Sequence, residues 1–517
     1  MTHLIYPQNV CNSRVAFYLF LLTYSSYSQT YFSKRLDPAL KSNLAATLKL
    51  YDDTLFIPAQ VFETPGSYSS CMLKITKTGT IISQKRFKPA NKSYEAGNDF
   101  LIKNNKFYVT SITADPTKLQ SGFYIFNKAC DTIFTRNYGD TNYYNFGFKI
   151  QPFNQTKDKF LLIGETDSTC GPGHLGYYKP ILRVVDTNGT LYQTKLYLTN
   201  NKYRTLTGSD TTLNKGYIIC GAEQLSSALA KPYILKIDSN LNQNWVLYLT
   251  NNSRSYYCDV TTLKNGKHIV SHNSVDSISG SNFFERIVLT KLDTNGSIIW
   301  QKYYGIKQQE ISSTTVRELS NNDLIVSGSR RVQYTSSVSQ VMGFIMKIDS
   351  SGNLKWWNNY IPISPIKDTI ADCYLYDVIQ MSDGGFAATG WADPSGYFGT
   401  KQETWLLRVD SMGCIVPGCN PLGTAIEEKN VENIIIKAYP NPFSDELNVS
   451  YNLTEKYKGA VLQLVEPSTG RVLVNSTITE PRGTTNFKME NISEGVYLVR
   501  IKREGAEEKN IKVVNIK

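Results

Sequence analysis

Several features that mark other classes of protein are scarce in this chain of 517 residues. After Tyr24 no apolar run approaches the roughly 20 residues that a membrane-spanning helix needs, so we expect no transmembrane segment. The 55 Lys and Arg residues outnumber the 44 Asp and Glu residues but do not gather into a basic run, so we expect no nucleic-acid partner. Long runs of Ala, Glu, Lys and Leu are few, which disfavours a helical protein.

Motifs of common enzymes are also missing. The sequence contains no His-Glu-x-x-His, no nucleophile elbow and no P-loop. His268 and His272 stand four apart, a spacing that can chelate a metal ion on a helix. We expect them on a strand, where their Cα atoms would be about 13 Å apart. We therefore expect no metal site and no cofactor, and we assign no catalytic residue.

The residues that are abundant are typical of β structure. The chain contains 34 Tyr, 22 Phe and 34 Gly, together with many Thr, Ser and Asn. Aromatic and β-branched residues favour strands, and Gly and Asn favour the turns between strands. An all-β fold is therefore predicted. The length requires several domains, or one large repetitive domain with an accessory.

The N-terminus has the pattern of a secretion signal. Arg14 precedes an apolar run at residues 15–24, and residues 26–28 (Ser-Tyr-Ser) supply small residues at the spacing of a cleavage site. We predict a signal peptide at residues 1–28, with cleavage before Gln29 and export through the periplasm. The alternative is a buried strand of the first domain, because the leader carries only one strong positive charge.

Removal of that leader would remove Cys11 and leave eight of the nine cysteines. Cys414 and Cys419 flank a Pro-Gly turn and are a candidate disulfide, which an exported protein can retain. Cys71 and Cys220 lie within or beside strand patterns, where a free thiol packs as a small apolar side chain. The sequence determines no other pairing.

A short element recurs along the chain. It has the form apolar-x-Lys/Arg-apolar-Asp-x-x-Gly, as in KLDTNG at residues 291–296 and KIDSSG at residues 347–352. The positions aligned with the Asp are Thr76, Asn127, Asp186, Asp238, Asp293, Asp349 and Asp410. Their spacing of about 55 residues defines seven repeats, a length found among propeller blades.

Each repeat is interpreted as four strands in two hairpins. In the fifth repeat we predict strands at residues 259–263, 267–272, 286–293 and 297–304, with Asn-Gly turns inside the hairpins and a longer loop between them. The recurring Asp is expected to cap the N–H groups of its turn, and the following Gly to supply the left-handed residue. Both tight turns of a repeat then lie on one rim, and the longer loops share the opposite rim.

A Trp stands four residues beyond the glycine slot of the turn in three repeats, as Trp245, Trp300 and Trp356. Its position places it on one face of a strand, where we expect it to wedge between neighbouring sheets. The alternative is a Trp that stacks on a ligand. Packing is the simpler explanation, because the feature recurs in several sheets.

These repeats resemble a bacterial β-propeller repeat of the form GGF-apolar-x-x-G…W-L-apolar-K/R-x-D-x-x-G-x-x-x-W, and residues 383–413 are the clearest copy. The resemblance implies a seven-bladed β-propeller over residues 29–419, in which radially arranged sheets cover each other's faces. The first two repeats are degenerate, with Lys77 and Cys130 near slots that elsewhere hold turn residues. A count of six or eight blades therefore stays open.

The pattern changes after Cys419. Residues 420–433 have the composition of a polar linker, and residues 434–517 contain short alternating strands that predict a small immunoglobulin-like β-sandwich. This segment resembles the type A C-terminal sorting domain of the type IX secretion system (Por secretion system) of Bacteroidota. The matching positions are Tyr439, Pro440, Asn441, Pro442, Gly470, Arg471, Val472, Gly495, Val496 and Tyr497, followed by the basic tail at residues 512–517.

That resemblance implies that the type IX machinery is a partner through residues 434–517. It also implies passage of the folded chain across the outer membrane, followed by release or by attachment to the cell surface. The alternative is an ordinary fibronectin-like stalk domain.

The rim that carries the longer loops is the predicted ligand site, because aromatic and charged side chains on loops are the usual material of binding surfaces. The candidate ligand-binding residues are His174, Tyr177, Tyr178, Arg330, Arg331, Tyr334, Trp391, Asp393 and Tyr397. The leading hypothesis is an exported, non-enzymatic propeller that binds an extracellular glycan or protein there. The runner-up is an extracellular glycoside hydrolase or lyase whose carboxylates converge on the same face. The third is a structural component of the envelope.

Overall fold

The computed structural model describes residues 31–516, with gaps at 37–41, 65–66, 88–92, 95–98, 115–118, 141, 154–157, 168–176, 201, 227–228, 250–251, 255, 280–281, 308, 334–338, 363–371, 394–401, 417–418, 420–434, 454–456, 468, 490–491 and 504–508. The fold is all-β, and the described residues form no α-helix. Among them, accordingly, no helix has the length and apolar character needed to cross a membrane. The predicted signal peptide lies outside the described residues. The chain divides into two compact units, residues 1–425 and 426–517.

Strands of the first unit form antiparallel groups that follow the repeats of the sequence. The groups are β2 (Asn43–Ala45), β3 (Lys49–Tyr51), β4 (Thr54–Thr64), β5 (Ser67–Thr76) and β6 (Ile81–Phe87); β7 (Ser93–Tyr94), β8 (Asp99–Lys103), β9 (Lys106–Ala114), β10 (Leu119–Asn127) and β11 (Thr132–Tyr138); β12 (Asn145–Pro152), β13 (Lys159–Thr166), β14 (Lys179–Asp186) and β15 (Leu191–Leu196); β16 (Arg204–Thr211), β17 (Tyr217–Gln224), β18 (Ala230–Ile237) and β19 (Gln243–Tyr248); β20 (Cys258–Thr262), β21 (His268–Ser279), β22 (Asn282–Leu292) and β23 (Ile298–Tyr304); β24 (Glu310–Glu318), β25 (Leu324–Gln333), β26 (Ser339–Ile348) and β27 (Leu354–Tyr360); and β28 (Asp372–Gln380), β29 (Phe386–Asp393) and β30 (Glu403–Val409) with β1 (Phe32–Leu36). Single parallel bridges, Glu285 to Glu310 and Val341 to Asp372, join the last three groups into one 12-stranded sheet.

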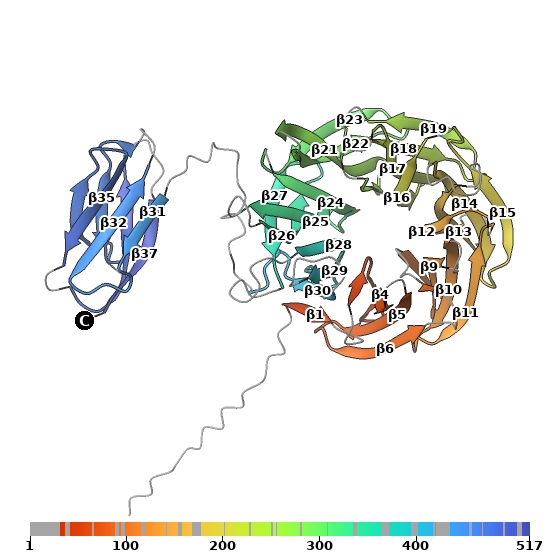
Figure 1. Cartoon of the computed structure of the whole chain (residues 1–517), viewed down its shortest axis with the longest axis horizontal. Coiled ribbons are helices and arrows are strands. Elements are labelled where there is room, and N and C mark those ends of the chain that lie inside the picture. The colour runs from red at the N-terminus through yellow and green to blue at the C-terminus, as the bar shows by residue number, and fades with distance from the viewer. Residues whose placement is uncertain are drawn as a thin grey trace, which may run out of the picture. The chain divides into compact units, whose positions relative to one another are not determined.

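These groups follow one another in chain order around a ring (Figure 1). Strand β1 does not join the group that follows it in the chain. It pairs antiparallel with β30, from Phe32 opposite Arg408 to Leu36 opposite Thr404. The N–H of Thr404 also donates to Asn43 Oδ1 at 2.8 Å. The two ends of the first unit are therefore held together by backbone pairing.

Neighbouring groups share hydrophobic cores. One cluster joins Leu161 of β13 to Tyr217 and Leu235 of the next group, and all three side chains are buried. Another joins Cys220 of β17 to Val260 of β20. Burying one side chain of this size stabilises a fold by about 1.5–3 kcal/mol. Each sheet thus covers a face of its neighbour, which explains why the sheets form a ring.

The recurring Asp caps its turn, as predicted. Asp293 Oδ1 accepts the N–H groups of Asn295 at 2.9 Å and Ser297 at 2.8 Å, and Gly296 has a φ of +90°. The bonds from Ser297 and Asn295 hold the pKa of the Asp293 carboxyl below its ordinary value. The same pair of bonds forms at Asp186, Asp238, Asp349 and Asp410.

The degenerate second repeat keeps this turn with different residues. Asn127 Oδ1 accepts the N–H groups of Ala129 at 2.9 Å and Asp131 at 2.8 Å. Cys130 occupies the glycine slot with a φ of +65°. The turn therefore survives where its sequence signal is weak.

The repeated Trp packs against the turn of the following group, as predicted. A Cβ on Gly413 would lie only 2.7 Å from Cζ3 of Trp356, so a side chain there would collide with the ring. The equivalent pairs are Trp300 with Gly352 and Trp245 with Gly296. Tyr360 adds a hydrogen bond from its hydroxyl to the carbonyl of Gly413 at 2.7 Å. Each turn glycine thus provides the space into which a neighbouring ring fits.

The prediction of a longer loop between the two hairpins of the fifth repeat is wrong. Strands β21 and β22 continue to a tight hairpin in which Ser279 pairs with Asn282, with a register shift between Val275 and Ser277. The segment NSVDSIS at residues 273–279 has little apolar alternation, which is why it did not indicate a strand. Backbone pairing with β22 holds it extended.

The cysteines that the structure describes fall into two classes. A disulfide joins Cys414 and Cys419 beside the last Asp-capped turn. Buried free thiols occur at Cys71, Cys130, Cys220, Cys258 and Cys373. Cys71 lies in β5 and Cys220 in β17, where each packs within an apolar cluster.

The second unit contains two sheets around one core. Its strands are β31 (Ile435–Tyr439), β32 (Glu446–Asn452), β33 (Val461–Val465), β34 (Val472–Thr477), β35 (Arg482–Lys488), β36 (Gly495–Lys502) and β37 (Lys509–Asn515). One sheet has the order β31-β32-β35 and the other β34-β33-β36-β37. Leu447 and Val449 of the first sheet pack with Leu462, Val499 and Val513 of the second.

Candidate functional site

The innermost strands of the first unit surround a polar channel of about 190 Å³. Its charged lining comes from strands far apart in the sequence and consists of Lys49, Asp99, Lys149, Asp210, Asp259, Arg317 and Asp377. Hydrogen bonds link each inner strand to the next around the channel. Asp259 of β20, for example, accepts from Thr315 Oγ1 at 2.8 Å and from the N–H of Val316 at 3.0 Å.

Hydrogen bonds between the other neighbouring inner strands complete a closed circuit around the channel. They are Asp377 with Thr47 and Leu48, Lys49 with Asp99, Asp99 with Ile150, Gln151 with Ser209, Asp210 with Thr261 and Thr262, and Arg317 with Asp377. Burial opposes ionisation of Asp99, but the charges of Lys49 and Lys149 hold its pKa below its ordinary value. The channel carboxylates are therefore engaged in holding neighbouring strands together.

A larger cavity of about 680 Å³, here called the aromatic hollow, adjoins this channel and shares Ala46, Lys149, Thr314 and Tyr376 with it. Its described lining is Leu44, Ala46, Phe146, Phe148, Lys149, Glu165, Tyr178, Tyr203, Thr205, Leu206, Thr207, Arg254, Tyr256, Tyr257, Thr314 and Tyr376. Many of these residues stand at or just before the starts of inner strands. The tight turns lie at the other ends of those strands.

Aromatic rings form a continuous series along the hollow. Phe148 and Phe146 stack with ring centroids 5.9 Å apart. Tyr178 then contacts Phe146 edge-on at 5.2 Å and Tyr203 at 5.2 Å. Tyr256 continues the series at 6.0 Å from Tyr203. The arrangement follows from the fold, because Phe146, Tyr203 and Tyr256 begin successive groups at the same level.

Glu165 is the carboxylate of the described lining, and it lies on β13 opposite Phe146 of β12. Its side chain is only 4% exposed and accepts the N–H of Leu206. Burial raises the pKa of Glu165 to about 8, since a single hydrogen bond does not replace the water that an ionised carboxylate would lose. At neutral pH this group is therefore a protonated acid.

Two cations line the hollow, Lys149 of β12 and Arg254 between β19 and β20. The guanidinium of Arg254 lies 5.8 Å from the ring centroid of Phe283. Its backbone N–H donates to the buried Glu285 at 2.6 Å, and Ser253 Oγ donates to the same carboxylate at 2.8 Å. Further along the segment, the N–H of Cys258 donates to Thr207 Oγ1 at 2.9 Å. The backbone that presents Arg254 is thus fixed at both ends.

The predicted ligand residues are only partly brought together. Tyr178 lines the aromatic hollow, whereas the adjacent Tyr177 is exposed outside the residues that line it. Trp391 is buried in β29, stacks on Tyr374 at 4.6 Å and donates from Nε1 to the hydroxyl of Tyr376 at 3.0 Å. Trp391 therefore supports the hollow from behind its lining. Asp393 is buried at the end of the same strand.

The two predicted arginines lie on β25 rather than on a loop. Arg331 pairs with Glu310 of the adjacent β24 at 3.0 Å and also donates to Ser339 Oγ at 3.1 Å. Burial lowers the pKa of Arg330. Neither residue lines the hollow. His174, Tyr334 and Tyr397 fall outside the described residues.

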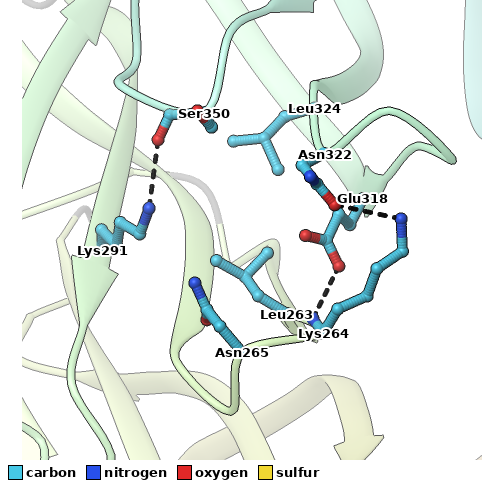
Figure 2. A pocket seen from close by; sticks show the side chains of 8 residues that line it. All are labelled: Leu263, Lys264, Asn265, Lys291, Glu318, Asn322, Leu324 and Ser350. Carbon is cyan, nitrogen blue, oxygen red and sulfur yellow. Dashed lines mark hydrogen bonds between the residues drawn. The ribbon is translucent and has the colours of Figure 1, made fainter.

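A third cavity, of about 400 Å³, lies among the tight turns (Figure 2). Lys264 Nζ there donates to the carbonyls of Leu319 and Ser320, each at 2.8 Å. Lys291 Nζ donates to the carbonyl of Ser350 at 3.0 Å. The lysines at this rim are therefore bound to the turns of neighbouring groups.

His268 and His272 both lie on strand β21, as predicted, and both are buried. Burial lowers the pKa of each imidazole to about 4, with the charge of Lys236 adding to the effect at His268. The described residues contain no group of three or more His, Cys, Asp or Glu arranged to hold a metal ion.

In the second unit, the sorting-motif residues connect the two ends of the domain. Asn441 Oδ1 accepts the N–H of Val514 at 2.9 Å, and the N–H of Phe443 donates to the carbonyl of Val514 at 2.9 Å. Tyr497 is buried and its hydroxyl donates to the carbonyl of Ser493 at 2.7 Å. Tyr439 remains exposed, while Gly470 stands in a turn with a φ of +73°.

Several residues that line the aromatic hollow were not predicted from the sequence. Phe146, Tyr203 and Tyr256 recur at intervals close to the repeat length, each at or just before the first strand of a repeat. That recurrence was available as a signal. Glu165 and Arg254 had no such signal, because each occurs in one repeat and is brought to the hollow only by the ring.

Solved structures with a detectable likeness have low sequence identity to this chain. An α-L-arabinanase of Penicillium chrysogenum is 12% identical, has a TM-score of 0.38 and covers 60% of this chain and 92% of its own. An α-L-arabinofuranosidase of Fusarium graminearum is 11% identical, with a TM-score of 0.38 and coverages of 60% and 92%. The polysaccharide lyase Uly1 is 7% identical, with a TM-score of 0.40 and coverages of 76% and 94%. Resemblances this distant do not indicate a shared activity.

The comparison of sequences gives a more specific result at the C-terminus. No curated protein matches the chain. Residues 437–517 match the family described as the secretion system C-terminal sorting domain. This match supports a cargo of type IX secretion, engagement with that machinery, and export to the cell surface or the extracellular space.

Proposed function

We propose that residues 29–419 form a seven-bladed β-propeller, residues 420–433 a linker and residues 434–517 an immunoglobulin-like sorting domain. The order of the strand groups around a ring supports the propeller, and the pairing of β1 with β30 would make β1 the outer strand of the last blade. Two sheets with a single core support the sandwich. A signal peptide at residues 1–28 would start the export that the sorting domain completes.

We propose further that this exported protein binds a glycan in the aromatic hollow. The observation that carries the proposal is the continuous series of ring contacts from Phe148 to Tyr256. The C–H faces of sugars pack on aromatic rings, while their hydroxyls need a few polar groups at fixed positions. Glu165 and the Thr residues of the lining supply such groups.

The size of the cavity favours a glycan over a protein partner. Small-molecule sites have volumes of about 300–1,000 Å³, a range that includes the 680 Å³ of the hollow. A stable protein partner buries about 800 Å² on each side, which a concave site of this size does not offer. The hollow also adjoins the channel, so a chain of several sugar units could extend along it.

A hydrolase or lyase at the same hollow is the second candidate, and Glu165 is the observation that favours it. A buried acid with a pKa of about 8 can donate a proton to a leaving group at neutral pH. Glycoside hydrolysis requires a second carboxylate about 5–10 Å away. The channel carboxylates are bound to neighbouring strands, so binding without turnover remains the leading function.

The proposal is tested with residues 29–517 on a glycan array, followed by calorimetry of the retained glycans. Tyr203→Ala should weaken binding by about 10-fold or more, because it breaks the ring series between Tyr178 and Tyr256. Tyr192→Ala is the matched control, since Tyr192 is an exposed residue of β15 outside the lining. Retention of no glycan, or equal affinity for both variants, would contradict glycan binding in the hollow.

Turnover is measured separately as the release of reducing ends or unsaturated sugars. A binding protein should release neither. If product is released and Glu165→Gln stops the release while affinity is kept, the second candidate replaces the first. Turnover that is unchanged in Glu165→Gln would exclude Glu165 as the acid.

A further inference from the structure

The described lining of the aromatic hollow contains more cationic than acidic residues. Lys149 and Arg254 are the cationic residues of its described lining, and Glu165 is the acidic one. Because burial raises the pKa of Glu165 to about 8, this acid is uncharged at neutral pH. The described lining of the hollow therefore carries two positive charges and no ionised carboxylate.

Within the described part of the chain, neither cation forms an ion pair. The charge of Lys149 acts on Asp99, but that carboxylate is already paired with Lys49 at 3.1 Å. The guanidinium of Arg254 is exposed and rests over the ring of Phe283. Five guanidinium donors and one ammonium group thus remain to be satisfied by water or by a ligand.

The carboxylates near the hollow are already engaged by other groups. The channel carboxylates accept hydrogen bonds from neighbouring strands, and Asp259 and Asp377 are bound by Val316 and Arg317. Asp167 is buried and accepts the N–H of Tyr144 at 2.7 Å. The titratable groups facing Glu165 are the tyrosines Tyr178, Tyr203 and Tyr233, whose raised pKa values leave them neutral.

Arg254 is also held in place before any ligand arrives. Its segment donates two hydrogen bonds to Glu285 that fix the backbone, and Phe283 supports the planar guanidinium. A guanidinium that extends from a fixed backbone and rests on a ring loses less freedom when it forms paired hydrogen bonds with a planar anion. Arg is accordingly suited to carboxylates and sulfates.

We propose that the ligand of the aromatic hollow is an anionic glycan, whose sugar rings lie on the series from Phe148 to Tyr256 and whose carboxylate or sulfate groups bind Arg254 and Lys149. This inference rests on the proposed glycan binding and adds the charge of the ligand. Uronic acids and sulfated sugars share the required chemistry, and the experiment distinguishes them.

The test compares matched ligands on the chain comprising residues 29–517. Polygalacturonate is compared with its methyl ester, and a sulfated galactan with its desulfated form, by calorimetry at neutral pH and low salt. At least one acidic ligand should bind about 10-fold or more tightly than its neutral counterpart, and raising the salt concentration should reduce that difference. The pair that shows the difference identifies the anionic group.

Two variants connect the preference to the named cations. Arg254→Gln should weaken binding of the acidic ligand by about 10-fold to 100-fold, and Lys149→Met by a smaller factor, with little change for the neutral form. Lys106→Met is the matched control, because Lys106 is an exposed residue at the start of β9, outside the lining.

The outcomes separate this inference from the function on which it rests. Equal binding of acidic and neutral forms overturns the anionic preference and leaves glycan binding intact. Binding of no glycan at all overturns both. A preference for acidic ligands that survives Arg254→Gln and Lys149→Met together would also overturn the inference, because other cations would then be responsible.

Discussion

The tight-turn rim and the aromatic hollow use similar residue types with different partners. At the turns, Asp349 is bound by backbone N–H groups, and Lys264 by carbonyls of the adjacent turn. At the hollow, Lys149 and Arg254 form no ion pair with described residues, and Glu165 is held neutral by burial. Polar groups that the chain itself satisfies stabilise the ring. Polar groups that are fixed in place but left without a charged partner are available to a ligand.

Repetition distinguishes the two regions as well. The Asp and Gly of the turns and the Trp that packs on them recur from repeat to repeat, as a device for joining sheets must. Glu165 and Arg254, in contrast, each occur in one repeat and have no equivalent in the others. The comparison predicts that variants at the joints alter stability more than binding, and that variants in the hollow do the reverse.

The largest effect on stability is expected where a Trp packs between neighbouring sheets. Trp356→Ala removes a buried ring from the contact with Gly413 and should lower the free energy of unfolding by about 3–5 kcal/mol. Trp300→Ala is the control and should cost less, because Trp300 is only half-buried. Urea denaturation measures both. A loss below about 1 kcal/mol for Trp356→Ala would contradict the packing role.

A smaller loss is expected in the channel. Asp377→Ala breaks the bonds to Arg317, Thr47 and Leu48, and should lower the free energy of unfolding by about 2–3 kcal/mol, since Arg317 can recover part of its hydration. Asp377→Asn keeps acceptors for Thr47 and Leu48 and should lose less. Equal stability of all three proteins would mean that the circuit does not hold the ring together.

The pH dependence of stability should have opposite signs at the buried histidines of β21 and at Glu165 of the hollow. The pKa of His268 and of His272 falls from 6.5 to about 4 on folding, so their contribution is present above pH 6.5 and is lost as the pH falls through 4. The pKa of Glu165 rises from 4.5 to about 8, so its contribution is present below pH 4.5 and is lost as the pH rises through 8.

Variants separate these two contributions. Unfolding free energies between pH 4 and pH 9 should fall less steeply toward high pH in Glu165→Gln, and less steeply toward low pH in His272→Gln. An unchanged profile in Glu165→Gln would show that the acid is ionised in the folded protein. An ionised Glu165 would offset one of the two positive charges that Lys149 and Arg254 give the hollow.

The smallest effect is expected at a single turn. Asp349→Ala removes the acceptor for the N–H groups of Ser351 and Asn353 and should cost about 0.5–1 kcal/mol. Glycan affinity should not change, because the turns lie at the far ends of the strands from the hollow. A change in affinity would indicate that the two regions are coupled.

The sequence predicted local structure more successfully than the site. Asp293 and Trp356 act through neighbours at fixed spacing in a repeat, so their turn and packing roles could be inferred from the chain alone. Predicted residues Trp391 and Arg331 proved to be parts of paired strands, because the polar ends of strands look like loops when periodicity is the only guide.

Residues of the hollow could not be assembled in the same way. Glu165 and Arg254 come from different repeats, and their proximity depends on ring closure rather than on local pattern. The shift in the pKa of Glu165 depends on burial, which one repeat read by itself does not reveal. The channel circuit was missed for the same reason, since Asp259 and Thr315 are joined only across neighbouring groups.

The assignment of the aromatic hollow as the ligand site is tested most directly by finding which backbone amides a bound glycan protects from hydrogen exchange. Hydrogen exchange of residues 29–517, measured with and without an acidic oligosaccharide that binds, should show added protection in peptides covering residues 145–149, 203–207 and 252–258. Peptides covering the turns at residues 264–267, 319–323 and 349–353 should be unchanged. Protection confined to those turns would contradict the assignment of the aromatic hollow as the ligand site.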